Sequence, residues 1–348
     1  MIHALKHRFR YVNKGEKKLN KLFQDLITLC DKGLEKRIKT EGCDDCKCPT
    51  GSDDSCKGSC KRKLNCEECL EAFFYGDELQ RNKRYDCIPI TYSYVLKYLN
   101  RYSSEIFRIF LQKPEMIEKL NYSLIFSLGC GPATELISID ELIKVNHLNN
   151  VNYCGFDLNK IWEKTHLIIT HQSDNKELKF KFKEELITED TFGLNKIDFL
   201  FLNYVCSDVY VHEKTNHENL QEWLDSKVTP LVQKMKKGAY IIINDVNSPN
   251  MGRNIIQEWA YNLKESRSVE ADFFTFIKLI PSKIYPGKMY ELKFDSKVNS
   301  TTIYDNSLIF QDSYSITESG HCLFDKTPTE CGSCFIIMQK KRTIVEEQ

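Results

Sequence analysis

The chain has 348 residues, 49 basic and 49 acidic side chains, and 41% apolar residues. This composition is typical of a globular protein and excludes a strongly charged disordered chain. No stretch approaches the roughly 20 apolar residues that cross a bilayer, and residues 1–10 lack the apolar segment of a signal peptide. We therefore expect a cytoplasmic protein with no membrane association, whose cysteines stay reduced unless metal binds them.

Residues 1–40 are predicted to form a basic helical arm. Seven Lys and Arg residues accompany a single acid, Glu16, between residues 1 and 21. Basic segments bind phosphate backbones through counterion release, although a solvated helix face has the same composition. We expect any nucleic-acid partner to bind through this arm and the segment that follows it.

Residues 41–88 are predicted to form a cysteine-rich metal module. Its candidate ligands are Cys43, Cys46, Cys48, Cys56, Cys60, Cys66, Cys69 and Cys87. Cys-x-x-Cys pairs place two thiolates on one tetrahedral ion, and metal would supply the folding energy that a polar segment lacks. We expect one or two zinc ions; an iron–sulfur cluster and a loop with free thiols are the alternatives.

Residues 89–120 are predicted to form a helical connector or lid. Tyr94, Tyr98 and Tyr102 recur every four residues, as on one helix face. Bases stack on exposed tyrosines, but a buried stripe with bonded hydroxyl groups is the favoured interpretation.

A glycine-rich turn follows the apolar run 123–128. Gly129 and Gly131 allow close approach of the backbone to a ligand, and the next helix would direct its N-terminal N–H groups at an anionic group. A second apolar run, 151–156, ends at Asp157, which can accept hydrogen bonds from ribose hydroxyls. A dinucleotide and S-adenosylmethionine are the two candidate ligands, and Thr134 stands where the dinucleotide fingerprint has its third glycine.

Further apolar runs predict strands at 197–205, 239–243 and 334–340. Residues 218–237 have apolar side chains at helical spacing, and Gly238 follows as a stop signal. Strands that alternate with helices indicate a parallel α/β sheet. His321, Cys322, Cys331 and Cys334 have a spacing that could bind zinc, but small apolar residues flanking the last strand are the favoured interpretation.

At the glycine turn and Asp157 the chain resembles the class I S-adenosylmethionine-dependent methyltransferases, over roughly residues 120–340. The resemblance implies, at 121–345, a Rossmann-like, seven-stranded, mostly parallel sheet with helices on both faces, closed by an antiparallel hairpin from 305–340. It implies a cofactor site formed by Ser127, Gly129, Cys130, Gly131, Asp157, Leu158, Asn203 and Tyr98. Further wall candidates are Tyr92, Tyr94 and Arg101. Ser127 replaces a common acid, and Ala133 replaces a common glycine.

Methyl transfer needs a positioned nucleophile, and a base only where the acceptor carries a proton. The candidate catalytic residues are Asn203, Tyr204 and Asp208, with Tyr210, His212, Asp245 and Asn247 as further substrate-side candidates. Asn203-Tyr204 lacks the prolines of the family's adenine-N6 and glutamine methyltransferases. Cys206 lacks the Pro-Cys context of the cytosine-C5 enzymes and is interpreted as a core residue.

These observations predict S-adenosylmethionine-dependent methylation of a nucleic acid, with RNA favoured, presented by the metal module. One alternative is methylation of a protein or small molecule, with zinc purely structural. The other is a methyltransferase-like binding protein with weak catalysis or none, because function depends on sites and not on folds.

Overall fold

A single large sheet forms the centre of the computed structural model, which describes residues 20–40, 88–191, 193–216, 219–276, 280–281, 289–290, 301–303, 306–310 and 330–341. The eight strands of this sheet are ordered β3-β2-β1-β4-β5-β10-β6-β9. In chain order they are β1 (Leu124–Leu128), β2 (Val151–Phe156), β3 (Leu178–Lys183), β4 (Phe199–Asn203), β5 (Tyr240–Val246), β6 (Val269–Phe276), β9 (Thr301–Ile303) and β10 (Ser333–Lys340). A separate ribbon pairs β7 (Ile280–Pro281) with β8 (Met289–Tyr290).

Strands β1 to β5 are parallel, and β10 is antiparallel to both of its neighbours, β5 and β6. Ser127 of β1 lies opposite Gly155 of β2 and Phe201 of β4. The carboxyl ends of β1, β2 and β4 therefore meet at one edge of the sheet, where ligands of open α/β sheets bind.

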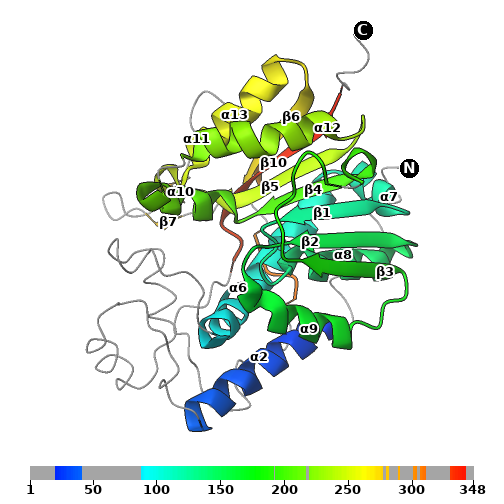
Figure 1. The fold of residues 1–348 in the computed structure, drawn as a ribbon, viewed down its shortest axis with the longest axis vertical. Coiled ribbons are helices and arrows are strands. Elements are labelled where there is room, and N and C mark those ends of the chain that lie inside the picture. Colours follow the sequence, from blue (N-terminus) through cyan, green and yellow to red (C-terminus); the bar gives the residue numbers. More distant parts are fainter. Residues whose placement is uncertain are drawn as a thin grey trace.

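Helices cover both faces of the sheet and make three layers (Figure 1). One layer contains α2 (Lys21–Thr40), α6 (Ile88–Gln112), α7 (Pro114–Leu120), α8 (Thr134–Asn146) and α9 (Glu163–Gln172); the other contains α10 (Cys206–Asn216), α11 (Leu220–Trp223), α12 (Thr229–Lys234) and α13 (Arg253–Glu265). Strands that are covered on both faces have to be apolar throughout, which explains the continuous apolar runs of the sequence.

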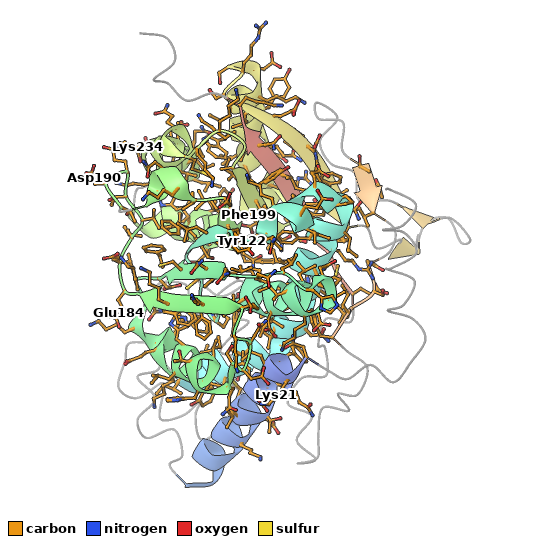
Figure 2. All side chains as sticks on the ribbon, turned by 90° about the vertical axis from the view of Figure 1, so that its right-hand side faces the viewer. Lys21, Tyr122, Glu184, Asp190, Phe199 and Lys234 are labelled. Carbon is orange, nitrogen blue, oxygen red and sulfur yellow. The ribbon has the colours of Figure 1, made fainter. Side chains whose placement is uncertain are left out.

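Successive residues of β4 show how the layers divide the core. Phe199 and Phe201 pack in the same cluster as α6, with Phe110 of that helix 5.7 Å from the Phe199 ring. Leu200 and Leu202 pack in the opposite cluster with α11, α12 and α13. In Figure 2, Phe199 lies near the middle of the molecule. The predicted α/β, Rossmann-like fold class is confirmed.

The predicted helix 218–237 is interrupted. Between α11 and α12 the chain makes a π turn over Leu224–Val228. Pro230 has no N–H group to donate to the helical ladder, which accounts for the irregular bonding at this point. The helical stretch stops before Gly238, which has a φ of 79°.

The prediction for the closing hairpin was wrong in its first strand. β10 confirms the predicted last strand, but its antiparallel partner at the sheet's end is β6, residues 269–276, and not a strand from 305–340. β6 carries Glu270 and Asp272, which break its apolar pattern, and these acids form ion pairs with Lys341 and Lys113. The described sheet also has eight strands where seven were predicted, because β9 adds an edge beside β6.

Helix α2 belongs to the main core. Leu22, Phe23 and Leu26 are buried in the same cluster as α6 and α8. Several of the predicted features lie outside the described residues. These are residues 1–19 of the basic arm, the eight candidate cysteines of the metal module, and His321 and Cys322. Within the described ranges no group of three or more His, Cys, Asp or Glu side chains could hold a metal ion, so the metal module stays a prediction. No described helix is long and apolar enough to span a membrane.

Candidate functional site

The glycine turn begins directly after β1 and depends on glycine at both positions. Gly129 has a φ of 62° and Gly131 a φ of 50°, in the left-handed region that disfavours side chains. A Cβ at Gly129 would come 2.7 Å from Cγ2 of Val205. A Cβ at Gly131 would meet nothing closer than 3.8 Å, where the Trp162 ring lies.

Asp157, which directly follows β2, holds this turn in place. The Gly131 N–H donates to Oδ2 of Asp157 at 2.8 Å, and the Asn159 N–H donates to Oδ1 at 2.8 Å. Burial raises the pKa of Asp157, while these two backbone bonds oppose the rise. Each carboxylate oxygen keeps a second lone pair, so the group can still accept bonds from two ligand hydroxyls.

A cavity of about 310 Å³ opens beside the turn, at the ends of β1, β2 and β4. Much of its wall is aromatic: Tyr94, Tyr102, Phe156, Trp162, Tyr204 and Trp223. Its acidic lining residues are Asp157 and Asp208, and none of its described lining residues is Lys, Arg or His. A concave site that combines aromatic and apolar side chains with polar groups is typical of a small-molecule pocket.

The structure brings most of the predicted site residues to this cavity. Those lining it are Gly129, Cys130, Gly131, Asp157, Leu158, Asn203, Tyr204 and Asp208. Two predicted cofactor residues do not line it. Ser127 is fully buried beneath the turn, and Tyr98 stacks on Tyr102 with ring centroids 5.1 Å apart. Of the wall candidates on α6, Tyr94 lines the cavity, and Tyr92 and Arg101 do not.

Ser127 forms a hydrogen bond with the buried carboxylate of Glu135, which was not predicted from the sequence. Its hydroxyl donates to Oε1 of Glu135, which also accepts from the Tyr153 hydroxyl at 2.6 Å. Burial raises the pKa of Glu135, and the two hydroxyl bonds oppose the rise. The acid expected at position 127 is therefore replaced by a small donor, and the nearby acid comes from the first turn of α8.

Asn203 and Tyr204 are tied into a second buried network around Glu105. The Tyr204 hydroxyl donates to Oε2 of Glu105 at 2.8 Å, and Asn244 Nδ2 donates to the same oxygen at 3.0 Å. Asn244 Nδ2 also reaches Oδ1 of Asn203 at 2.9 Å. Arg101 Nε donates to Oε1 of Glu105 at 2.9 Å. These contacts fix both side chains as parts of the cavity wall.

The sequence carried a signal for this network. Arg101 and Glu105 stand four residues apart on α6, which is the spacing of an ion pair on one helix face. Buried charges are almost always paired, and the fully buried Glu105 carboxylate is the centre of this network.

His166 supports the glycine turn from the other side and was also missed. Its Nε2 donates to the Gly131 carbonyl at 2.7 Å, and its ring stacks on Phe182 at 3.8 Å. Burial lowers the pKa of His166 to about 4, so the ring is neutral at pH 7. A second hollow of about 490 Å³ continues from Asp157 and Asn159 past His166 to Phe182.

The remaining candidates whose side chains the structure describes do not line the cavity. Asp245 is buried and accepts from the Ser207 N–H at 3.0 Å at the start of α10; burial raises its pKa to about 6. Asn247 bonds Thr275 and Arg253. Cys206 is fully buried, in line with the core interpretation. Tyr210 packs beside the helices of that face, and the His212 side chain lies outside the described residues.

Cys331 and Cys334, the described half of the second cysteine group, are buried. Cys334 belongs to β10, opposite Asp245 of β5 and Thr275 of β6. Both therefore have the burial expected of small core residues.

No protein-family model matches this chain, and no curated protein matches it. Among solved structures, it is similar to a candidate class I S-adenosylmethionine-dependent methyltransferase from Listeria monocytogenes, at 11% identity, covering 94% of this chain and 91% of that one, with a TM-score of 0.38. A candidate RNA methyltransferase from Pyrococcus horikoshii shares 8% identity over 69% of this chain and 84% of that one, with a TM-score of 0.34.

The O-methyltransferase TomG from Streptomyces achromogenes, solved with S-adenosylmethionine, shares 9% identity over 70% of this chain and 90% of its own, with a TM-score of 0.35. These identities and TM-scores are low. The function proposed below is therefore derived from the residues of the site.

Proposed function

We propose that this protein binds S-adenosylmethionine at the glycine turn and transfers its methyl group to an acceptor. The observation that carries the proposal is the bond between the Gly131 N–H and the Asp157 carboxylate, across the ends of two adjacent parallel strands. Gly131, which has no side chain, and the carboxylate of Asp157 therefore line the same cavity.

The described residues fit each part of this ligand. Asp157 would hold the ribose hydroxyls. Leu158 and Leu186 line the cavity with 62% and 47% of their surfaces exposed, and large exposed apolar side chains at a pocket suit the flat adenine. The turn from Gly129 to Gly131 would take the amino-acid end of the ligand.

The chain's own chemical contribution is chiefly positioning. When bound, S-adenosylmethionine supplies an activated methyl group on a positively charged sulfur. The Tyr204 hydroxyl and the Asn203 amide are held in the cavity wall by Glu105 and Asn244, and a catalytic role for either residue stays a prediction. Asp208, in the first turn of α10, lines the cavity and is the candidate base for an acceptor that carries a proton.

We propose a nucleic acid as the acceptor, with RNA favoured. The support is the excess of basic residues before α2 and the zinc-binding spacing of the cysteines in residues 43–87. A protein or small-molecule acceptor with a structural zinc site, and a binding protein without turnover, are the competing functions.

Calorimetry of the full chain with S-adenosylmethionine tests ligand binding. We expect binding to a single site, weakened at least about tenfold in Asp157→Ala, since a charged hydrogen-bond acceptor is worth roughly 1.5–3 kcal/mol. Asp190→Ala is the matched control, because that carboxylate is exposed and does not line the cavity. Absence of binding to the intact chain would contradict the proposal.

The acceptor is tested by incubating the protein with isotopically labelled methyl donor and separate RNA, protein and small-molecule fractions. Label in RNA that falls as salt rises is the expected result, because phosphate contacts weaken with salt. Label in the protein fraction alone would favour the second function.

A further inference from the structure

The cavity wall beside the glycine turn is built from π faces. Trp162 Cε2 and Cζ2 lie 3.8 Å from the position of a Cβ on Gly131. The rings of Tyr102 and Tyr204 stack with centroids 3.6 Å apart. Trp162, Tyr102 and Tyr204 belong to a single packed cluster and all line the cavity. Three aromatic rings therefore line the cavity next to the glycine turn, one of them at van der Waals distance from a Cβ placed on Gly131.

Tyr204 is held in a strained backbone conformation that keeps its ring in this wall. Its φ is 59°, in a region that bulky residues rarely adopt and that persists only where the surroundings enforce it. Its N–H donates to the Asn244 carbonyl at 2.8 Å and its hydroxyl to Glu105 at 2.8 Å. Donation to a carboxylate shifts electron density into the phenol ring, which strengthens the attraction of its face for a cation.

The charges around the wall reinforce this attraction. The cavity is lined by two carboxylates and, within the described chain, by no basic side chain. Arg101 lies 5.8 Å from the Tyr102 ring centroid, but its guanidinium is ion-paired with Glu105 at 2.9 Å. The described lining of the cavity therefore combines aromatic rings with two carboxylates and no basic side chain.

We infer that Tyr204 and Trp162 make the site select the positively charged methyl donor over its neutral thioether product, S-adenosylhomocysteine. This inference rests on the proposed function. The two ligands share adenine, ribose and amino acid, so Asp157, Leu158 and Leu186 would hold them alike. They differ in the methyl group and the charge on sulfur, and aromatic faces bind cations more tightly than neutral groups of similar shape.

Calorimetry with three ligands tests the inference on the full-length protein: S-adenosylmethionine, S-adenosylhomocysteine, and sinefungin, which carries a protonated amine in place of the sulfonium. We expect both charged ligands to bind roughly two- to thirtyfold more tightly than S-adenosylhomocysteine, the range that cation–π contacts give. Equal or tighter binding of S-adenosylhomocysteine to the intact protein overturns the inference without any variant.

Two variants assign the preference to Tyr204. Tyr204→Leu should weaken S-adenosylmethionine and sinefungin severalfold more than S-adenosylhomocysteine, and Tyr204→Phe, which keeps the ring, should retain most of the preference. Leu186→Ala is the matched control: it should weaken all three ligands equally and leave the ratio unchanged. An unchanged ratio in a folded Tyr204→Leu protein overturns the assignment. Absence of binding of all three ligands to the intact protein would instead contradict the proposed function.

Discussion

The backbone N–H of Gly131 donates a 2.8 Å hydrogen bond to Oδ2 of Asp157, joining the end of β1 to the end of β2. The Gly131 carbonyl accepts from His166 on the other side, so both backbone groups of this residue are fixed. The turn is thus held in a ligand-ready shape by side chains from two other segments. Such preorganisation reduces the entropy lost on binding.

Alanine substitutions at Gly129 and Gly131 should separate the energetic cost of backbone strain from the cost of a steric clash. Gly131→Ala places a Cβ at van der Waals distance from Trp162, without a clash, at a φ of 50° and should cost about 1–2 kcal/mol of unfolding free energy. Gly129→Ala adds a contact of 2.7 Å with Val205 and should cost more. Urea unfolding measures both.

The double variant Gly129→Ala/Val205→Ala provides the control for the clash. The double variant should regain the unfolding free energy that the clash costs, but not the unfolding free energy that the strained backbone costs. Equal stabilities of the two single alanine variants would contradict this account.

Removing the carboxylate of Glu105 should be among the most damaging single changes in the chain. Glu105→Ala leaves the partly buried Arg101 without its ion-pair partner and removes the acceptor for Tyr204 and Asn244, and should cost about 3 kcal/mol. Glu105→Gln keeps the volume and an acceptor oxygen and should cost less. We expect Arg101→Met/Glu105→Leu to recover much of the stability lost by Glu105→Ala, and urea midpoints test this order.

An acid at position 127 should destabilise this chain although it is common in the resembled family. Ser127→Asp would set a second carboxylate against buried Glu135, whose pKa burial already raises. We expect a loss of about 2 kcal/mol or more at pH 7, smaller at pH 5, where one proton can be shared. Ser127→Ala, which removes one hydrogen bond, should cost about 1 kcal/mol at both pH values. A stable Ser127→Asp protein would show that Glu135 relocates.

Asp245 should make stability depend on pH. Its folded-state pKa of about 6 lies above the ordinary 3.8, so the folded protein binds its proton more tightly than the unfolded chain. The stability it contributes is therefore highest below pH 4 and is lost as pH rises to about 6, by about 3 kcal/mol. Unfolding free energies of the intact protein and Asp245→Asn, measured from pH 4 to pH 7, should converge toward the acidic end. A constant difference would contradict this assignment.

The sequence predicted those parts of the fold that depend on local pattern. The strands around Phe126, Phe201 and Ile242 are continuous apolar runs because helices cover both of their faces. The strand at Val269–Phe276 was missed because Glu270 and Asp272 find lysine partners far away in the chain. Ion pairs between segments that are far apart in the chain cannot be recognised from the local sequence pattern.

The candidate site also has residues that were predicted from the sequence and residues that were not. Gly129, Gly131 and Asp157 were predictable because each follows directly after an apolar run and has a chemical reason to be there. Glu105 and His166 reach the site from other elements, through contacts that only the folded chain creates. Ser127 was placed correctly at the strand end, but its partner Glu135 depends on how α8 packs over β2.

The position of β10 has a consequence for how this protein forms in the cell. β10 is the last described strand in the chain, yet it lies between β5 and β6 and pairs with both. While the ribosome is still making residues 281–332, β6 has no neighbour joining it to β5. Val269–Phe276 then presents apolar side chains and unpaired backbone groups to other nascent chains. The pairing of β6 to the rest of the described sheet is therefore completed only once residues 333–340 have been made.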